Sequence, residues 1–147
     1  MRCVIQKVNK SSVTVDGKVI SEIGRGLNVL VGFTDSDTEE DIKYCVRKIV
    51  NLRVFEDEND VMNLSVLDVK GEILSISQFT LYGDTRKGNR PSYVRALGGD
   101  KALPMYERFN ELLNLEVPTK GGVFGADMKV EILNDGPTTI IIDTEVK

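Results

Sequence analysis

The sequence predicts an α+β fold, built as one compact domain over residues 1–147 with mainly antiparallel strands and two long helices. Apolar runs and alternating segments of strand length recur along the chain, whereas two longer stretches carry apolar residues at helical spacing. No internal repeat, low-complexity stretch or linker interrupts them. The chain has 147 residues, of which 41% are hydrophobic, and this is enough for a single domain with its own core.

The first strands lie within residues 2–33. Residues 2–8 have the character of a strand, and residues 12–15 alternate with a period of two. Asp16-Gly17 then predicts a tight hairpin turn into a strand at residues 18–20. Residues 27–33 form a nearly continuous apolar run, which predicts a strand buried on both faces.

The first helix is expected to begin after Thr38. A threonine followed by three acidic residues is typical of a helix start, because the acids complement the positive end of the helix dipole. The next apolar residues fall at i, i+3, i+4 and i+7 and form one face. They are Ile42, Cys45, Val46 and Ile49.

Residues 52–55 predict a short strand, and residues 56–60 an acidic turn. A solvated loop is favoured over a calcium site there, since the ligand spacing and the glycine of a calcium-binding loop are missing.

A second helix is expected at about residues 101–113, with Tyr106, Phe109 and Leu113 facing inward. Pro104 is compatible with this helix only in its first turn, because proline has no N–H and clashes with the preceding turn. Residues 72–82 predict a strand that ends in a polar motif. Residues 130–133 and 138–143 predict two strands paired around a turn.

The charge and the absence of histidine limit the possible functions. The net charge is −4 and the chain has no basic run, which excludes binding of nucleic acid through a large positively charged surface. Contact with RNA would therefore be local, at an RNA end. DNA is not expected as a partner. The chain has no histidine, which excludes a Ser-His-Asp triad, a Cys-His dyad and histidine metal sites.

The two cysteines, Cys3 and Cys45, fall in apolar patterns, and buried free thiols are favoured over a disulfide. Two isolated cysteines cannot form a zinc site, and we expect no metal and no cofactor. No apolar run approaches the roughly 20 residues of a membrane span, and no signal peptide pattern is present. We therefore expect a cytoplasmic protein with no membrane partner.

The polar motif is Ser77-Gln78-Phe79-Thr80. Neighbouring side chains of a strand point to opposite faces, so these residues converge only if the strand ends or bends here. A strand end also leaves backbone N–H groups unpaired, and such groups can bind the oxyanion that develops when an ester is attacked. The motif thus offers a route to ester hydrolysis that needs no histidine.

A second motif, Gly136-Pro137, lies near the C-terminus. This step fixes the main chain and removes one N–H donor. A trans peptide bond is the common form, whereas a cis bond before proline costs only about 0.5–1 kcal/mol. The residues alone leave both forms open.

Together these two segments resemble the signatures of the D-aminoacyl-tRNA deacylase family, and the resemblance extends from Met1 to Asp143. It implies barrel-like sheets, a homodimer, and hydrolysis of the ester between a D-amino acid, or mischarged glycine, and the 3′ end of tRNA. The implied partners are the acceptor end of aminoacyl-tRNA and an identical subunit.

The resemblance also implies roles for individual residues. Ser77, Gln78, Phe79 and Thr80 would position the substrate and bind the transition state, while the 2′-hydroxyl of the terminal ribose helps to activate the attack. Gly136 and Pro137 would form a cis bond, reach into the partner subunit's site and reject L-amino acids by a steric clash with rigid main chain.

Two further segments are similar to the family. Phe124, Ala126 and Met128 are expected in the pocket wall, although ordinary core packing is an equal alternative for Phe124 and Met128. Arg86, Lys87 and Arg90 could contact tRNA phosphates, although for any one of them a solvated loop side chain is the commoner case.

Two other functions are compatible with the residues. One is a module that binds a tRNA end or an amino acid without turnover. The other is a general esterase with Thr80 as nucleophile, for which the sequence offers no evident base.

Overall fold

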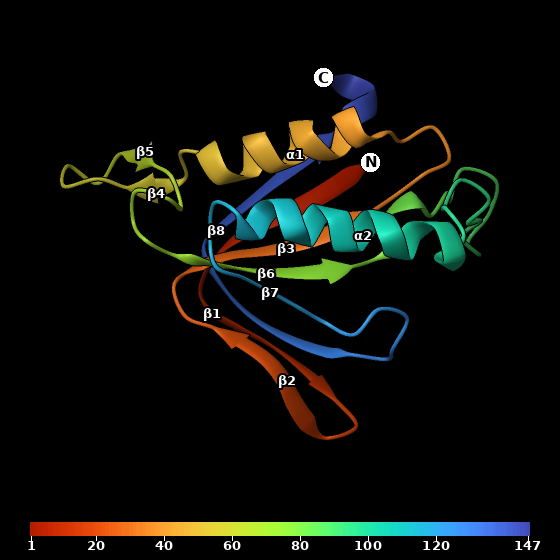
Figure 1. Cartoon of the computed structure of the whole chain (residues 1–147), viewed down its shortest axis with the longest axis horizontal. Coiled ribbons are helices and arrows are strands. Elements are labelled where there is room, and N and C mark those ends of the chain that lie inside the picture. Colours follow the sequence, from red (N-terminus) through yellow and green to blue (C-terminus); the bar gives the residue numbers. More distant parts are fainter.

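The computed structural model describes all 147 residues, and the long strand β1 (Arg2–Val15) organises its sheet. Along one edge β1 pairs with β3 (Gly26–Gly32) and then with β2 (Lys18–Ile23), and along the other edge it pairs with β8 (Lys129–Asp143). All three pairings are antiparallel. The strands predicted at residues 2–8 and 12–15 are thus parts of one strand (Figure 1).

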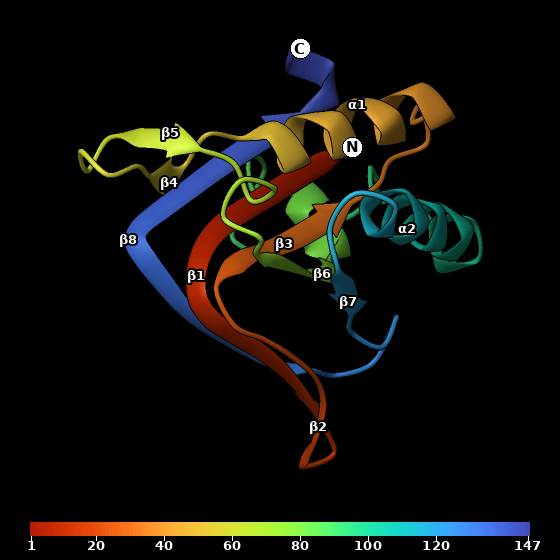
Figure 2. The same ribbon diagram turned by 60° about the vertical axis from the view of Figure 1, so that its left-hand side comes forward.

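The sheet continues through two parallel pairings, from β3 to β6 (Glu72–Ser77) and from β6 to β7 (Thr119–Gly121). It then curls back toward β2, where the Ser21 hydroxyl donates a hydrogen bond of 2.6 Å to the Gly121 carbonyl. Figure 2 shows β1 and β8 bending together along this curve. The predicted barrel-like sheet is therefore present and is nearly closed.

Both helices pack on the same face of the sheet (Figure 1). Helix α1 (Glu39–Asn51) begins after Thr38, whose hydroxyl accepts from the Asp41 N–H while the Asp41 carboxylate accepts from the Thr38 N–H. This reciprocal pair satisfies two backbone donors at the helix start. The predicted inward residues of α1 are all buried, which confirms the assigned face.

Helix α2 (Gly99–Asn114) starts two residues earlier than predicted, so Pro104 lies in its second turn and not its first. Tyr106, Phe109 and Leu113 are buried as expected. The hydroxyl of Tyr106 donates to the Ser75 carbonyl on β6 at 2.6 Å, which ties the helix to the strand that carries the polar motif. Neither helix has the length and apolar character that crossing a bilayer requires.

The main core lies between the helices and the sheet, and a smaller apolar cluster around Val8 and Leu74 packs separately. Cys3 and Cys45 are buried in the main core as free thiols, which confirms the prediction. The interaction with the Cys45 thiol, together with complete burial, raises the pKa of Cys3 well above its ordinary value. These thiols therefore act as core side chains and not as nucleophiles.

Two strand boundaries differ from prediction. Of residues 52–55, only the last belongs to a strand, β4 (Phe55–Glu56), which pairs with β5 (Met62–Leu64). The strand predicted at residues 72–82 ends at Ser77, and a 3₁₀ turn, η1 (Phe79–Tyr82), follows. The strand ends because the Gln78 carbonyl accepts from the Leu81 N–H at 3.4 Å and closes the chain into this turn.

The C-terminal pairing was predicted wrongly. Residues 130–133 and 138–143 do not pair with each other but belong to the single strand β8, and both halves pair with β1. Gly136-Pro137 lies in an irregularity between them, where the register against β1 shifts near Val8. The uninterrupted edge of β1 offers hydrogen-bond partners to both halves, and a bulge lets the strand continue. A short turn, η2 (Thr144–Val146), follows β8.

Candidate active site

A cleft of about 480 Å³ opens at the carboxyl end of β6. Ser77, Gln78 and Phe79 line one side of it, where the strand passes into η1. Phe124 and Met128, two of the residues expected in the pocket wall, line another side. Ala126, the third, lies between them in the same wall. The structure thus brings two separate predicted segments together around one cavity.

The junction between β6 and η1 presents free backbone donors. The Gln78 N–H still donates to the Val31 carbonyl on β3, at 2.7 Å, and completes the sheet. The N–H groups of Phe79 and Thr80 belong to the first turn of η1, and the first N–H groups of such a turn have no carbonyl partner within it. Two adjacent donors of this kind are suited to an oxyanion.

Thr80 is exposed and does not line the cleft. Its hydroxyl oxygen accepts a hydrogen bond from the Gln78 side-chain amide, which is its one partner. An amide cannot take a proton from a hydroxyl group, so Thr80 lacks the base that a nucleophile needs. The geometry therefore favours a supporting role, in which Thr80 orients Gln78.

Gly32, at the end of β3, was not identified from the sequence. A Cβ atom at this position would lie 2.8 Å from the Gln78 carbonyl oxygen and 3.2 Å from the Leu81 Cβ. The absence of a side chain thus lets η1 approach β3 closely. The glycine near the end of the apolar run at residues 27–33 could have indicated that another segment packs closely there.

We expect Gly32→Ala to displace η1 and to lower both stability and activity. The new Cβ meets the main-chain carbonyl oxygen of Gln78, which cannot move aside without shifting the cleft edge. The expected loss of stability is on the order of 1–3 kcal/mol, as for other overpacked sites. Thermal unfolding and turnover rates measure the two effects. Gly17→Ala is the matched control, since a Cβ there meets no atom within 4 Å, and it should affect stability but not the cleft.

Tyr93 is a second cleft residue that is not among the predicted site residues. Its ring packs edge-on against Phe79, with centroids 5.1 Å apart and an interplanar angle of 72°. Both rings are substantially exposed, and they form an aromatic rim at the mouth of the cleft. Leu97 and Ala102 line it more deeply. These positions come from the loop before α2 and from its first turns, where the sequence shows no motif.

The Gly136–Pro137 peptide bond is cis, and neither residue lines the cleft of its own chain. Asn134 holds this segment: its side-chain amide donates to the carbonyls of Lys7 and Thr138, each at 3.0 Å. Its side-chain oxygen accepts from Gln6 at 3.2 Å. The motif is therefore fixed to β1, with Gly136 and Pro137 exposed.

Arg86 lines a separate cavity, while Lys87 and Arg90 are exposed in the loop that follows η1. The guanidinium of Arg86 and the backbone N–H of the same residue lower the pKa of Asp84 to about 2. Asp84 is therefore ionised at any physiological pH. The three basic side chains expected near the acceptor end do not converge on one point.

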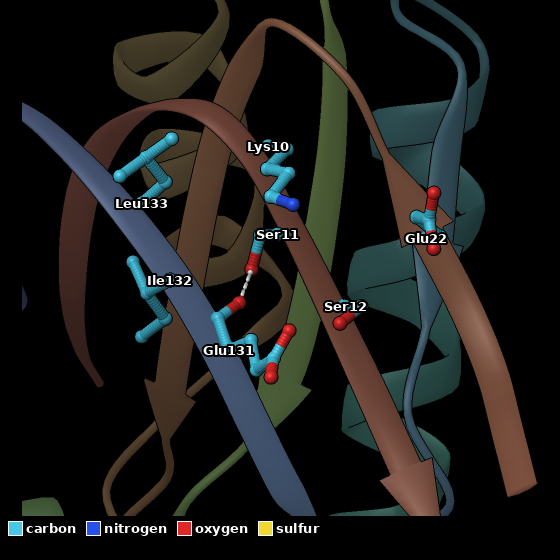
Figure 3. A pocket seen from close by; sticks show the side chains of 7 residues that line it. All are labelled: Lys10, Ser11, Ser12, Glu22, Glu131, Ile132 and Leu133. Carbon is cyan, nitrogen blue, oxygen red and sulfur yellow. Dashed lines mark hydrogen bonds between the residues drawn. The ribbon is translucent and has the colours of Figure 1, made fainter.

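A further cavity of about 300 Å³ lies between β1, β2 and β8 (Figure 3). Its one buried polar side chain is Ser11, whose hydroxyl donates to the Glu131 carbonyl and lies within hydrogen-bond distance of the Asn28 amide oxygen. The charged residues around it, Lys10, Glu22 and Glu131, are exposed. This cavity offers no set of converging groups comparable to the cleft.

Comparison with known proteins gives consistent matches over nearly the whole chain. A family model described as D-Tyr-tRNA(Tyr) deacylase matches residues 4–143. A D-aminoacyl-tRNA deacylase of Clostridium botulinum (strain Eklund 17B / Type B) is 60% identical, over 98% of this chain and 97% of the relative. A D-aminoacyl-tRNA deacylase of Clostridium beijerinckii is 61% identical, over 99% of this chain and 98% of the relative.

Two solved structures share the fold. A protein described as c-Myc DNA Unwinding Element Binding Protein superposes with a TM-score of 0.94 at 45% identity, covering 98% of this chain and 99% of the other. A probable eukaryotic D-amino acid tRNA deacylase superposes with a TM-score of 0.81, covering 96% of this chain and 97% of the other. At 19% identity, the second match supports the fold alone.

Proposed function

Because this chain belongs to the D-Tyr-tRNA(Tyr) deacylase family, we propose that it hydrolyses the ester bond between a D-amino acid, or glycine, and the 3′ end of tRNA. The observation that carries this proposal is the cleft at the end of β6, which three residues of the polar motif line where the first turn of η1 begins. The enzyme would remove wrongly charged amino acids before translation, in the cytoplasm. Turnover of D-tyrosyl-tRNA by the purified protein tests it, and binding without turnover would support the non-catalytic alternative.

The proposed chemistry relies on main-chain donors and on the substrate. None of the residues that line the cleft is acidic or basic, so no side chain there can serve as a strong general base. Water would attack the ester carbonyl carbon, and the oxyanion would accept hydrogen bonds from the N–H groups of Phe79 and Thr80. The ribose 2′-hydroxyl, next to the ester, would orient the water, and the departing ribose oxygen would take up a proton.

We expect Thr80→Ala to keep most of the activity, with a loss of no more than about tenfold in kcat. The substitution keeps the backbone N–H and removes a hydroxyl whose one partner is Gln78, so only the orientation of Gln78 suffers. Removal of a true nucleophile would instead abolish turnover. Single-turnover deacylation of D-tyrosyl-tRNA distinguishes the two. Thr14→Ala, on β1 and outside the cleft, is the control for loss of a threonine hydroxyl.

We infer that selection against L-amino acids comes from Gly136 and Pro137 of a second copy of the chain. Both residues are exposed and lie outside the cleft of their own chain. They could therefore line a cleft only if it belongs to a second copy of the chain. The outer edge of β8 has no strand partner, and Ile141 on the same strand is 70% exposed. An open edge and exposed apolar side chains favour a protein–protein contact.

The description of one solved structure includes DNA binding. This chain supports DNA binding less well than deacylation. The net charge is −4, and several of the arginines are paired with carboxylates within the chain. A protein that follows the DNA backbone needs a surplus of positive charge on one face. Deacylation remains the function that the site supports best.

A further inference from the structure

The separate cavity that Arg86 lines has a volume of about 350 Å³ and lies on the other side of η1 from the cleft. Phe79, at the start of η1, lines the cleft, whereas Tyr82, at its end, lines this cavity. The segment after Tyr93 alternates in the same way: Ala96 faces the cleft and Arg95 the cavity. One turn of chain therefore separates the two sites. We call the cavity the arginine pocket, after Arg2, Arg86 and Arg95 in its lining.

The arginine pocket is built around the buried ring of Tyr82. The guanidinium carbon of Arg2 lies over this ring at 4.5 Å from its centroid, and that of Arg95 at 5.4 Å. The aromatic face attracts both cations and holds them near each other in spite of their like charge. Residues from the first strand and from the loop before α2 thus supply two guanidinium groups to one site.

Hydrogen bonds within the chain hold these guanidinium groups in place, but some of their N–H donors remain without a partner. Arg2 donates from Nε to Asp143 at 3.0 Å and from Nη1 to the Leu81 carbonyl at 2.9 Å, which leaves Nη2 free. Arg95 donates from Nη2 to Glu145, which leaves Nε and Nη1 free. Free donors on a fixed planar group recognise phosphate oxygens with little loss of conformational freedom on binding.

Arg86 is the adjustable member of the pocket. Its side chain is 82% exposed, and its carboxylate partner, Asp84, belongs to the same loop. Because each of the three guanidinium groups has a carboxylate partner, the pocket carries no surplus charge and would bind one local anion and not an extended backbone. Arg86 can turn from Asp84 toward such an anion at small cost, since exposed ion pairs contribute little.

We propose that the arginine pocket binds a backbone phosphate of the tRNA acceptor end while the aminoacyl ester lies in the adjacent cleft. This inference rests on the proposed deacylase function. Every aminoacylated tRNA carries a phosphodiester next to its terminal nucleoside, so a substrate whose ester enters the cleft brings a phosphate close to η1. Arginine is the side chain best suited to phosphate, because its donors match two oxygens at once.

The test compares three D-tyrosyl esters: of full tRNA, of the trinucleotide CCA and of adenosine, which has no phosphate. We expect Arg95→Gln to lower kcat/KM about tenfold for substrates that carry the bound phosphate, since hydrogen bonds to charged groups are strong. The adenosine ester should be unaffected. The slope of log KM for tRNA against log salt should also fall by about 0.7, the value for one phosphate contact on a single strand. Arg47→Gln, an exposed arginine on α1, controls for the change in net charge.

The outcomes separate the possible causes. A loss with both tRNA and the trinucleotide identifies a phosphodiester of the CCA end, and a loss with tRNA alone identifies a phosphate of the stem or of the 5′ terminus. An equal loss with the adenosine ester would mean that Arg95 acts on the cleft itself and would overturn the proposal. No loss with any substrate in either Arg95→Gln or Arg86→Gln would overturn it as well. If the wild-type protein hydrolyses none of the three esters, the deacylase assignment itself fails.

Discussion

The wild-type protein is expected to hydrolyse D-tyrosyl-tRNA and glycyl-tRNA and to leave L-tyrosyl-tRNA nearly intact. The proposed main-chain wall would clash with an L side chain, whatever that side chain is, but would have nothing to reject in glycine. A clash of about 3 kcal/mol in the transition state corresponds to discrimination of roughly a hundredfold. Matched D-, L- and glycyl-tRNAs incubated with the purified enzyme give the ratio directly. Equal rates for the D and L substrates would contradict this mechanism.

Pro137→Ala should allow the L substrate to react, because it removes the ring that holds the main chain of the proposed wall rigid. Activity toward the D substrate should change little, since the side chain of a D-amino acid points away from the proposed wall. Pro118→Ala is the matched control: it alters another exposed proline, at the start of β7. Selectivity that is lost in both variants would point to general loosening of the fold.

Mixed dimers test whether the wall belongs to the partner subunit. Phe79→Pro impairs a cleft by removing a backbone donor, and Pro137→Ala weakens a wall. In a dimer of the two variants, the one working cleft belongs to the Pro137→Ala chain and faces the intact proline of the Phe79→Pro chain. With the Phe79→Pro chain in excess, the L-to-D activity ratio should return to the wild-type value. A ratio that stays at the Pro137→Ala value, or a monomer by light scattering, would contradict selection by a second copy.

The elements that follow from local patterns were predictable from the sequence. The hairpin at Asp16-Gly17 and the buried face of α1 follow from turn chemistry and from helical spacing, and both are present. The pattern also predicted that the motif residues converge only if the strand ends among them, because side chains alternate along a strand; β6 does end there, and three of the four residues line the cleft. Glycine at residue 32 shows the limit: its significance depends on Gln78, which lies far along the chain.

Features that depend on distant partners were not predictable. The segment around Gly136-Pro137 has residues typical of a turn, and the choice between a hairpin and a bulge within β8 is made by the long edge of β1. The role of Arg2 was not predictable either, since its place in the sequence indicates only that it belongs to a strand. Its contacts to Leu81 and Asp143, which create the arginine pocket, join three distant parts of the chain.

We expect the kcat of Phe79→Pro to be about 10²–10³-fold lower than the kcat of Phe79→Ala. A ratio of this size is typical for the loss of one oxyanion donor. Both variants lose the aromatic ring and its contact with Tyr93. Only the proline variant also loses the backbone N–H, which the first turn of η1 leaves unpaired. The difference between the two variants therefore isolates the contribution of that donor to the transition state.

The site also tolerates proline on conformational grounds. Phe79 is the first residue of η1, a position where proline is favoured, and Gln78 before it is extended, with φ −145° and ψ 93°. Unfolding temperatures of the two variants should accordingly agree within a few degrees. KM should also agree, because the oxyanion forms only after binding, so the loss should fall on kcat. Equal kcat values for the two variants would show that the Phe79 N–H stabilises no charge, and the oxyanion would then have to be bound elsewhere in the cleft.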